Sequence, residues 1–105
     1  MLKNTGITNL STQELQKTLP EFLGTLKEGS YVTVVYTSNS GFEEYAKDLV
    51  ARLNKEHPEL GADKFKIESQ WLVSIGKRYS RESAQALKQY AIAHQIVEDA
   101  YIRKR

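Results

Sequence analysis

The chain has 105 residues, of which 40% are hydrophobic and 27% are charged, and it contains no cysteine. This length and composition predict one globular domain, residues 1–105, and exclude disulfides, thiolate catalysis and cysteine-based metal sites. The chain shows no apolar leader and no stretch long enough to span a bilayer, so we expect a cytoplasmic protein without membrane contact.

The charge of the chain is small overall but unevenly distributed. Net charge is +2. Residues 1–60 carry six Lys and Arg against eight Asp and Glu, a balance of −2, whereas residues 61–105 carry nine against five, a balance of +4. We therefore expect a surface that attracts anionic partners in the C-terminal part of the chain.

The first predicted element is a helix that begins after Ser11. Ser11 and Glu14 have the spacing of a capping box, in which each side chain satisfies a free backbone N–H at the helix start. Pro20 interrupts the apolar face that follows, because proline lacks the N–H that a continuing helix needs. We expect either a kink or two short helices that meet at Leu19.

A strand and a second helix follow. Residues 30–37 are almost wholly β-branched or aromatic and predict a largely buried strand. After a polar turn, a second capping box starts at Ser40, and apolar residues at helical spacing over 42–53 predict an amphipathic helix. This helix should end near Glu56, because the residue before Pro58 disfavours the helical conformation.

Residues 64–75 alternate between apolar and polar side chains, which predicts a half-buried strand. The odd-numbered residues from Phe65 to Ile75 would share one face. Because the stretch is longer than a usual strand, we expect either one bent strand or two strands that reverse near Ser69 and Gln70.

The last predicted element is a helix that starts after Ser80 as its N-cap and runs towards Ile102. Its apolar face includes His94 and faces the core. Ile92 and Ile96 lie on the otherwise polar side, so we expect either that a neighbouring segment covers them or that they form a homodimer or partner contact.

These elements define the expected fold class, which is α/β or α+β, with the order α-β-α-β(β)-α. A two- to three-stranded sheet would be packed by three helices. A helix between two strands favours a right-handed β-α-β unit with parallel pairing, whereas a hairpin within 64–75 would give an α+β arrangement. The residues expected in the core are Val32, Val34, Phe42, Leu49, Leu53, Phe65, Ile67, Leu87 and Val97.

The turn after the first strand is a candidate anion site. Backbone N–H groups and the helix dipole at a helix start favour an anion, and the site would comprise Ser38, Asn39, Ser40 and Gly41. Residues 36–41 resemble the phosphate-binding loop of flavodoxins. The resemblance covers only this turn, since Phe42 stands where that family has a further hydroxyl residue and the chain has too few strands, so no flavin is expected.

Catalytic patterns are weak in this sequence. Neither His57 nor His94 has a second histidine or a carboxylate at metal-binding helical spacing, and no Gly-x-Ser-x-Gly elbow occurs. The adjacent Glu43 and Glu44 are explained by their place at a helix start. We expect no enzyme, no metal and no cofactor.

The basic residues of the C-terminal part indicate contacts with nucleic-acid phosphates. Lys77, Arg78 and Arg81 surround Tyr79 at the start of the last helix, and Tyr79 would either stack on a base or pack under the loop. The tail, Arg103, Lys104 and Arg105, would add attraction that does not depend on base sequence.

The expected function is therefore that of a small non-enzymatic binding protein whose partner is DNA or RNA. No sequence specificity is predicted, because no aromatic RNP signature, Gly-x-x-Gly loop or zinc finger is present. Two alternatives remain open: a protein–protein interaction module, an inhibitor or adaptor acting through the last helix, and anion binding at the 37–42 turn.

Overall fold

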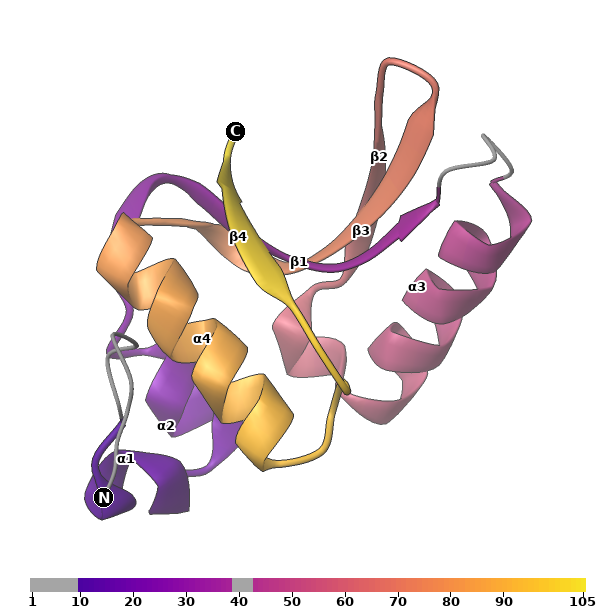
Figure 1. Ribbon diagram of the computed structural model, residues 1–105. Coiled ribbons are helices and arrows are strands. Elements are labelled where there is room, and N and C mark those ends of the chain that lie inside the picture. The colour runs from indigo at the N-terminus through magenta and orange to yellow at the C-terminus, as the bar shows by residue number, and fades with distance from the viewer. Residues whose placement is uncertain (1–9, 39–42) are drawn as a thin grey trace.

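The structure is a computed structural model, and it describes residues 10–38 and 43–105. Figure 1 shows the elements of this described chain. In chain order they are α1 (Thr12–Gln16), α2 (Leu19–Leu23), β1 (Glu28–Ser38), α3 (Glu44–Glu56), the 3-10 helix η1 (Pro58–Leu60), β2 (Asp63–Ile67), β3 (Gln70–Tyr79), α4 (Arg81–Ala93) and β4 (Tyr101–Lys104). No helix in the described ranges is long and apolar enough to cross a membrane.

The four strands form one antiparallel sheet in the order β2-β3-β1-β4. β1 pairs with β3 on one side and with β4 on the other, and β3 also pairs with β2. β1 and β2 therefore run in the same direction with β3 between them, which is the split β-α-β arrangement of ferredoxin-like folds. The fold class is α+β, and this arrangement by itself identifies no function.

The predicted parallel pairing is wrong, and the predicted strand count is too small. Residues 64–75 lie in a hairpin rather than in one bent strand, because β2 and β3 reverse at Glu68 and Ser69. Glu68 has a left-handed backbone (φ 57°), as tight hairpin turns require. β3, which follows this turn, pairs with β1, so β3 lies where a strand parallel to β1 was expected.

The hairpin turn also divides the alternating residues between the two faces of the sheet. Ile67 pairs with Gln70, so the two turn residues shift the alternation by one position. Phe65 and Ile67 consequently pack in one cluster, whereas Val73 and Ile75 pack in another. The prediction that the odd-numbered residues of 64–75 share one face is wrong for this reason.

The first helical region consists of two short helices rather than one kinked helix, and the second begins at Leu19 as one alternative predicted. The capping box of Ser11 and Glu14 is confirmed. A further capping box joins Thr18 and Glu21 at the start of α2. Pro20 follows in the first helical turn, where its missing N–H breaks no helix hydrogen bond.

For α3 and α4, the structure confirms some of the predicted helix ends. α3 ends at Glu56 as predicted, with Glu43 at its N-cap position. The capping box expected from Ser40 and the core position expected for Phe42 fall outside the described residues. Ser80 caps α4 as predicted, since its Oγ accepts a hydrogen bond from the N–H of Ser83 at 3.2 Å.

The predicted extension of the last helix towards Ile102 is wrong, because α4 ends at Ala93. Gln95 takes a left-handed conformation (φ 59°), which ends the helical run, and the chain returns to pair along β1 as β4. His94 was expected to face the core but is exposed at the C-cap of α4.

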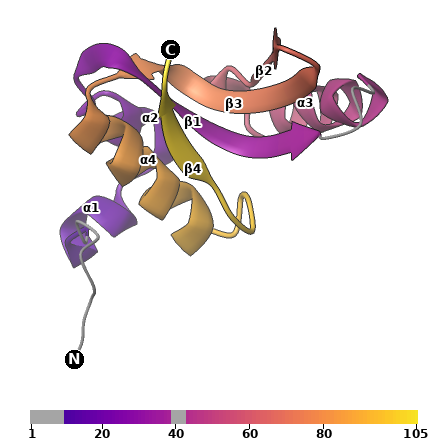
Figure 2. The same ribbon diagram turned by 45° about the horizontal axis from the view of Figure 1, so that its top comes forward.

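All the helices lie on one face of the sheet, and no element of the described chain covers the other face, as Figures 1 and 2 show. Thr33 marks the helix side, because its hydroxyl donates to the carbonyl of Ala84 on α4 at 2.8 Å. Val32 and Val34, its neighbours in the strand, point to the open face and pack there with Phe65 and Leu72.

Most of the predicted core is confirmed. Val32, Val34, Leu53, Phe65 and Leu87 are buried, and Leu49, Ile67 and Val97 are half-buried. These residues belong to two clusters, one under the helices and one on the open face, rather than to a single core.

Candidate nucleic-acid interface

The predicted basic residues come from two distant parts of the chain, and the sheet brings them to one end. Tyr31 of β1 pairs with Tyr79 of β3 on one side and with Lys104 of β4 on the other. Neighbouring strands lie about 4.8 Å apart, so these parts of β3 and β4 are separated by about 10 Å. We call this region the basic end of the sheet; it comprises Lys27, Lys77, Arg78, Arg81, Arg103, Lys104 and Arg105.

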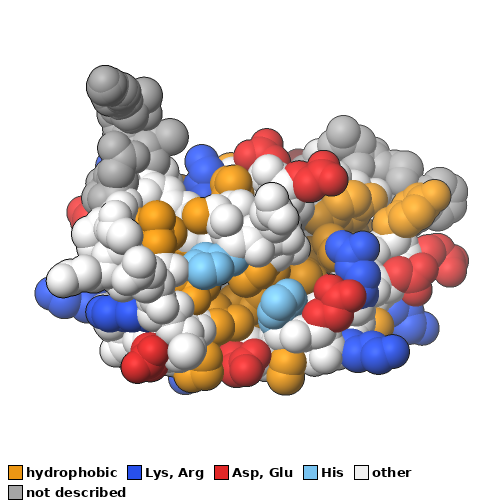
Figure 3. Space-filling model, turned by 90° about the horizontal axis from the view of Figure 1, so that it is seen from below, with side chains coloured by type: hydrophobic (Ala, Val, Ile, Leu, Met, Phe, Trp, Pro, Cys, Tyr) orange, Lys and Arg blue, Asp and Glu red, His pale blue; other side chains and the backbone are white. Residues whose placement is uncertain are grey.

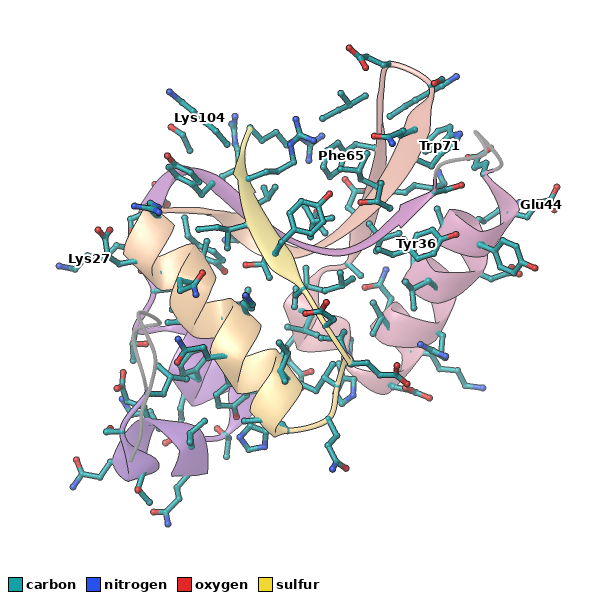
Figure 4. The ribbon with its side chains drawn as sticks, viewed as in Figure 1. Lys27, Tyr36, Glu44, Phe65, Trp71 and Lys104 are labelled. Carbon is teal, nitrogen blue, oxygen red and sulfur yellow. The ribbon has the colours of Figure 1, made fainter. Side chains whose placement is uncertain are left out.

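Lys27 was not found by the sequence analysis. Its carbonyl accepts a hydrogen bond from the N–H of Ser80 at 2.8 Å, and its own N–H donates to Oγ of Ser83 at 2.9 Å. Lys27 therefore lies beside the start of α4, as Figure 4 shows. The charge balance did not point to Lys27, because residues 1–60 carry a net negative charge.

The cations of the basic end are free to attract an anion. All are exposed except Arg103, which is half-buried. Lys64 Nζ forms an ion pair with Oε2 of Glu43 at 3.1 Å. Within residues 10–38 and 43–105, no ion pair involves a cation of the basic end. Two acids, Glu28 and Glu82, lie at the same end, so the cations remain in excess.

Tyr79 lies inside the protein rather than on this surface. It is 6% exposed and packs in the helix-side core, which is the second of the two outcomes expected for it, so it has no exposed face for a base. Gly76 allows this packing: its φ is +74°, and a Cβ there would lie 2.8 Å from the Tyr79 ring and from Leu87. Lys77 and Arg78 stay exposed beside it.

The tail is part of the sheet rather than a free basic extension. Arg103 pairs with Val32 and therefore shares its open face, and its Nε is buried without a hydrogen-bond partner. The Arg105 guanidinium lies 3.9 Å from the centre of the Phe65 ring, and its backbone N–H donates to Ser30 at 2.7 Å. Pairing with β1 thus holds these cations in fixed positions.

The candidate partner-binding residues lie on the helix side. Ile92 is half-buried on α4, and Ile96, beyond the helix end, packs against the core as the covered alternative expects. Ile96 also lines a groove of about 550 Å³ with Val35 and Leu49. Figure 3, seen from this side, shows hydrophobic side chains exposed among charges of both signs.

The candidate anion turn is described only at its first residue. Ser38 is buried at the end of β1, while Asn39, Ser40 and Gly41 fall outside the described residues. β1 is antiparallel to both of its neighbours, so the resemblance to flavodoxins does not extend to the sheet. Anion binding at this turn stays a prediction.

The two histidines lie apart from the basic end. Nε2 of His94 is 2.7 Å from the carbonyl oxygen of Leu15, and its ring packs on Tyr90 with centroids 4.1 Å apart. His57 is half-buried before η1. In the part of the chain that the structure describes, no three His, Asp or Glu side chains gather as metal ligands.

Comparison with known proteins gave no match, either to a family model, to a characterised protein or to a solved structure.

Proposed function

We propose that this protein binds nucleic acid through the basic end of its sheet, by contacts to phosphates that do not depend on base sequence. One observation carries the proposal: β1 holds Lys77 and Arg78 beside Lys104, although these residues are far apart in the chain. Cations that are exposed and unpaired gain most from phosphates, because each contact releases condensed counterions.

The start of α4 supports the same proposal. Arg81 is the first residue of this 13-residue helix, so its side chain adds to the positive end of the helix dipole. Lys27 is held beside it by hydrogen bonds to Ser80 and Ser83. A phosphate at this end would meet cations from a loop, a strand and a helix, which positions a backbone without reading its bases.

The proposal is tested by the salt dependence of binding. The observed affinity should fall with a log–log slope of about −0.9 per phosphate neutralised on duplex DNA and about −0.7 on single strands. Replacing Lys77, Arg78 and Arg81 together by alanine should flatten the slope by roughly two to three units, because three phosphate contacts are lost. Fluorescence anisotropy with labelled DNA or RNA over a salt series measures both slopes.

A matched control removes the same charge elsewhere. Lys47, Arg52 and Lys55 are exposed on α3, on the helix side of the sheet. Their joint replacement by alanine should leave the slope unchanged. Equal flattening by both triple variants, or no binding of the unaltered protein to any nucleic acid at about 50 mM salt, would contradict the proposal.

A second candidate function is supported by the groove beside Ile96. Its floor includes Val35 and Leu49, and its rim includes the acidic residues Glu56, Glu98 and Asp99. A neighbouring cavity of about 390 Å³ shares Leu49 and Arg52 with it. Such a groove suits a protein segment with apolar side chains flanked by Lys or Arg, from a partner or from a second copy in a homodimer.

This second candidate predicts an interaction that survives nuclease treatment. A partner captured from nuclease-treated lysate, or a dimer seen in sedimentation equilibrium, should be lost in Ile96→Asn, because a buried amide without a hydrogen-bond partner opposes docking. Retention of the partner or dimer by this variant would exclude the groove as the interface.

A further inference from the structure

The open face of the sheet carries one well-exposed aromatic side chain next to the basic end. In the described chain, the large hydrophobic side chains with high exposure are Tyr45, at 71%, and Tyr101, at 42%. Tyr45 belongs to α3 on the helix side. Tyr101 pairs with Val34, which points to the open face, so Tyr101 lies on that face as well.

The Tyr101 side chain is held across the neighbouring strand. It starts from β4, and its hydroxyl lies 2.6 Å from Oγ1 of Thr37 on β1. A ring anchored at both ends loses little further freedom when a ligand packs on its exposed side. Tyr101 is therefore an ordered aromatic surface on the outside of the sheet.

Two cations follow Tyr101 along the chain on the same face of the sheet. Arg103 follows two residues along β4, opposite Val32, and its buried Nε has no hydrogen-bond partner in the described chain. Arg105 reaches over the ring of Phe65, which Figure 4 shows on the side of the sheet away from the helices. A ligand for this face should thus offer both a flat ring and negative charge.

An apolar protein partner fits this face poorly. The buried residues of the open-face cluster, Val32, Val34, Phe65 and Leu72, are between 0% and 8% exposed, and the Arg105 guanidinium lies over the ring of Phe65. Little apolar area is left to bury apart from Tyr101. The exposed groups of this face include an aromatic ring and guanidinium groups, a combination that binds single-stranded nucleic acid.

We infer that the open face binds single-stranded nucleic acid, with one base stacked on Tyr101 and neighbouring phosphates on Arg103 and Arg105. The inference rests on the proposed function and adds that the nucleic acid bound at this face is single-stranded. A duplex keeps its bases stacked on one another, so only an unpaired strand presents a free base face to Tyr101. Stacking is tolerant of sequence because every base has a π-face.

The test measures anisotropy of labelled oligothymidylate, oligouridylate and a DNA duplex of the same length. Tyr101→Ala should weaken binding to the single strands by about 5- to 150-fold, the range for loss of one stacked base, without changing the salt slope. The affinity of Tyr101→Ala for the duplex should equal that of the unaltered protein. The affinities for oligothymidylate and oligouridylate, compared with each other, show whether the protein prefers single-stranded DNA or RNA.

Two further variants separate stacking from folding. Tyr101→Phe keeps the ring and loses only the hydrogen bond to Thr37, so most of the affinity should remain. Tyr45→Ala removes the other exposed tyrosine and should have no effect. If thermal unfolding shows that Tyr101→Ala is unfolded, Tyr101→Leu, which keeps side-chain bulk, should give the same selective loss.

Two results would overturn the inference. The first is unaltered single-strand affinity in Tyr101→Ala, and the second is an equal loss of affinity for single strand and duplex. In either case, salt-dependent binding by the unaltered protein would leave the proposed function standing. If the unaltered protein binds none of the three nucleic acids, both fail.

Discussion

The two faces of the sheet differ in what covers them. On the helix side, Tyr90 is stacked between Phe22 and His94, with ring centroids 4.1 Å away in both directions, within a cluster that spans all the long elements. On the open side, a small apolar cluster is covered by side chains such as Arg105. Most of the apolar core therefore lies under the helices, whereas the other face carries cations and an aromatic ring.

Polar contacts join the first helices to α4 on the helix side. The hydroxyl of Tyr90 donates to the carbonyl of Lys17, and the N–H of Leu10 donates to Oε1 of Gln89 at 3.1 Å. Burial raises the pKa of Tyr90, with a further contribution from the Glu21 carboxylate, so its hydroxyl remains a donor at neutral pH. On the open face, the hydroxyl of Tyr101 lies 2.6 Å from Oγ1 of Thr37, a contact between two neighbouring strands.

Leu87→Ala should have the largest effect on stability. Leu87 is fully buried in the helix-side cluster, where α4 packs on the sheet. The free energy of unfolding should fall by about 2–5 kcal/mol, through lost burial and the cavity left behind. Urea denaturation measures the change. A loss of a few tenths of a kcal/mol would mean that α4 does not pack as described.

Leu72→Ala is the matched change on the open face, and it should cost less. Leu72 is also fully buried, but it lies on the face of the sheet that no helix of the described chain covers. The loss should lie near the lower end of the range, about 2 kcal/mol, because a site that can collapse leaves a smaller cavity. Equal losses for Leu72→Ala and Leu87→Ala would remove the distinction between the two faces.

The smallest effect concerns the first turn of α2. Hydrogen bonds from the backbone and side chain of Thr18 lower the pKa of Glu21 below its usual value. A lowered pKa in the folded state contributes stability above the unfolded pKa, and this is lost as pH falls through the folded value. α2 should therefore loosen in acid before the sheet does.

An NMR titration of the Glu21 carboxyl group tests this expectation. In Thr18→Ala, the pKa of Glu21 should rise towards its usual value, because both hydrogen-bond donors change: the hydroxyl is lost and the helix start is no longer held in the capping box. An unchanged pKa in this variant would assign the shift to another cause.

Local structure was largely predictable from the sequence. The capping box at Ser11, the N-cap at Ser80 and the end of α3 before Pro58 are all confirmed. These features depend on residues only a few positions apart, so their physical causes are present in any short stretch of chain. Thr18 and Glu21 also have the spacing of a capping box, from which the start of α2 could have been predicted.

The candidate site was predictable only in part. Composition located the cations around residue 78 and at residues 103–105, but it could not show that Tyr31 lies between them. It also left open whether Tyr79 faces solvent, which depends on the close packing around Gly76. The last helix, predicted to run towards Ile102, would have included Tyr101, whereas the structure places Tyr101 in a strand on the open side of the sheet.

The sequence by itself determined where α1 and α4 begin, where α3 ends, most of the buried residues and where positive charge is concentrated. Tertiary structure alone decided the strand order, the end of α4 and the meeting of the two basic segments. The reason is physical: strands pair through backbone N–H and C=O groups that every residue except proline carries. Apolar residues such as Val97, Ala100 and Tyr101 match a helical period, yet pairing with β1 places the chain from Tyr101 onwards in β4.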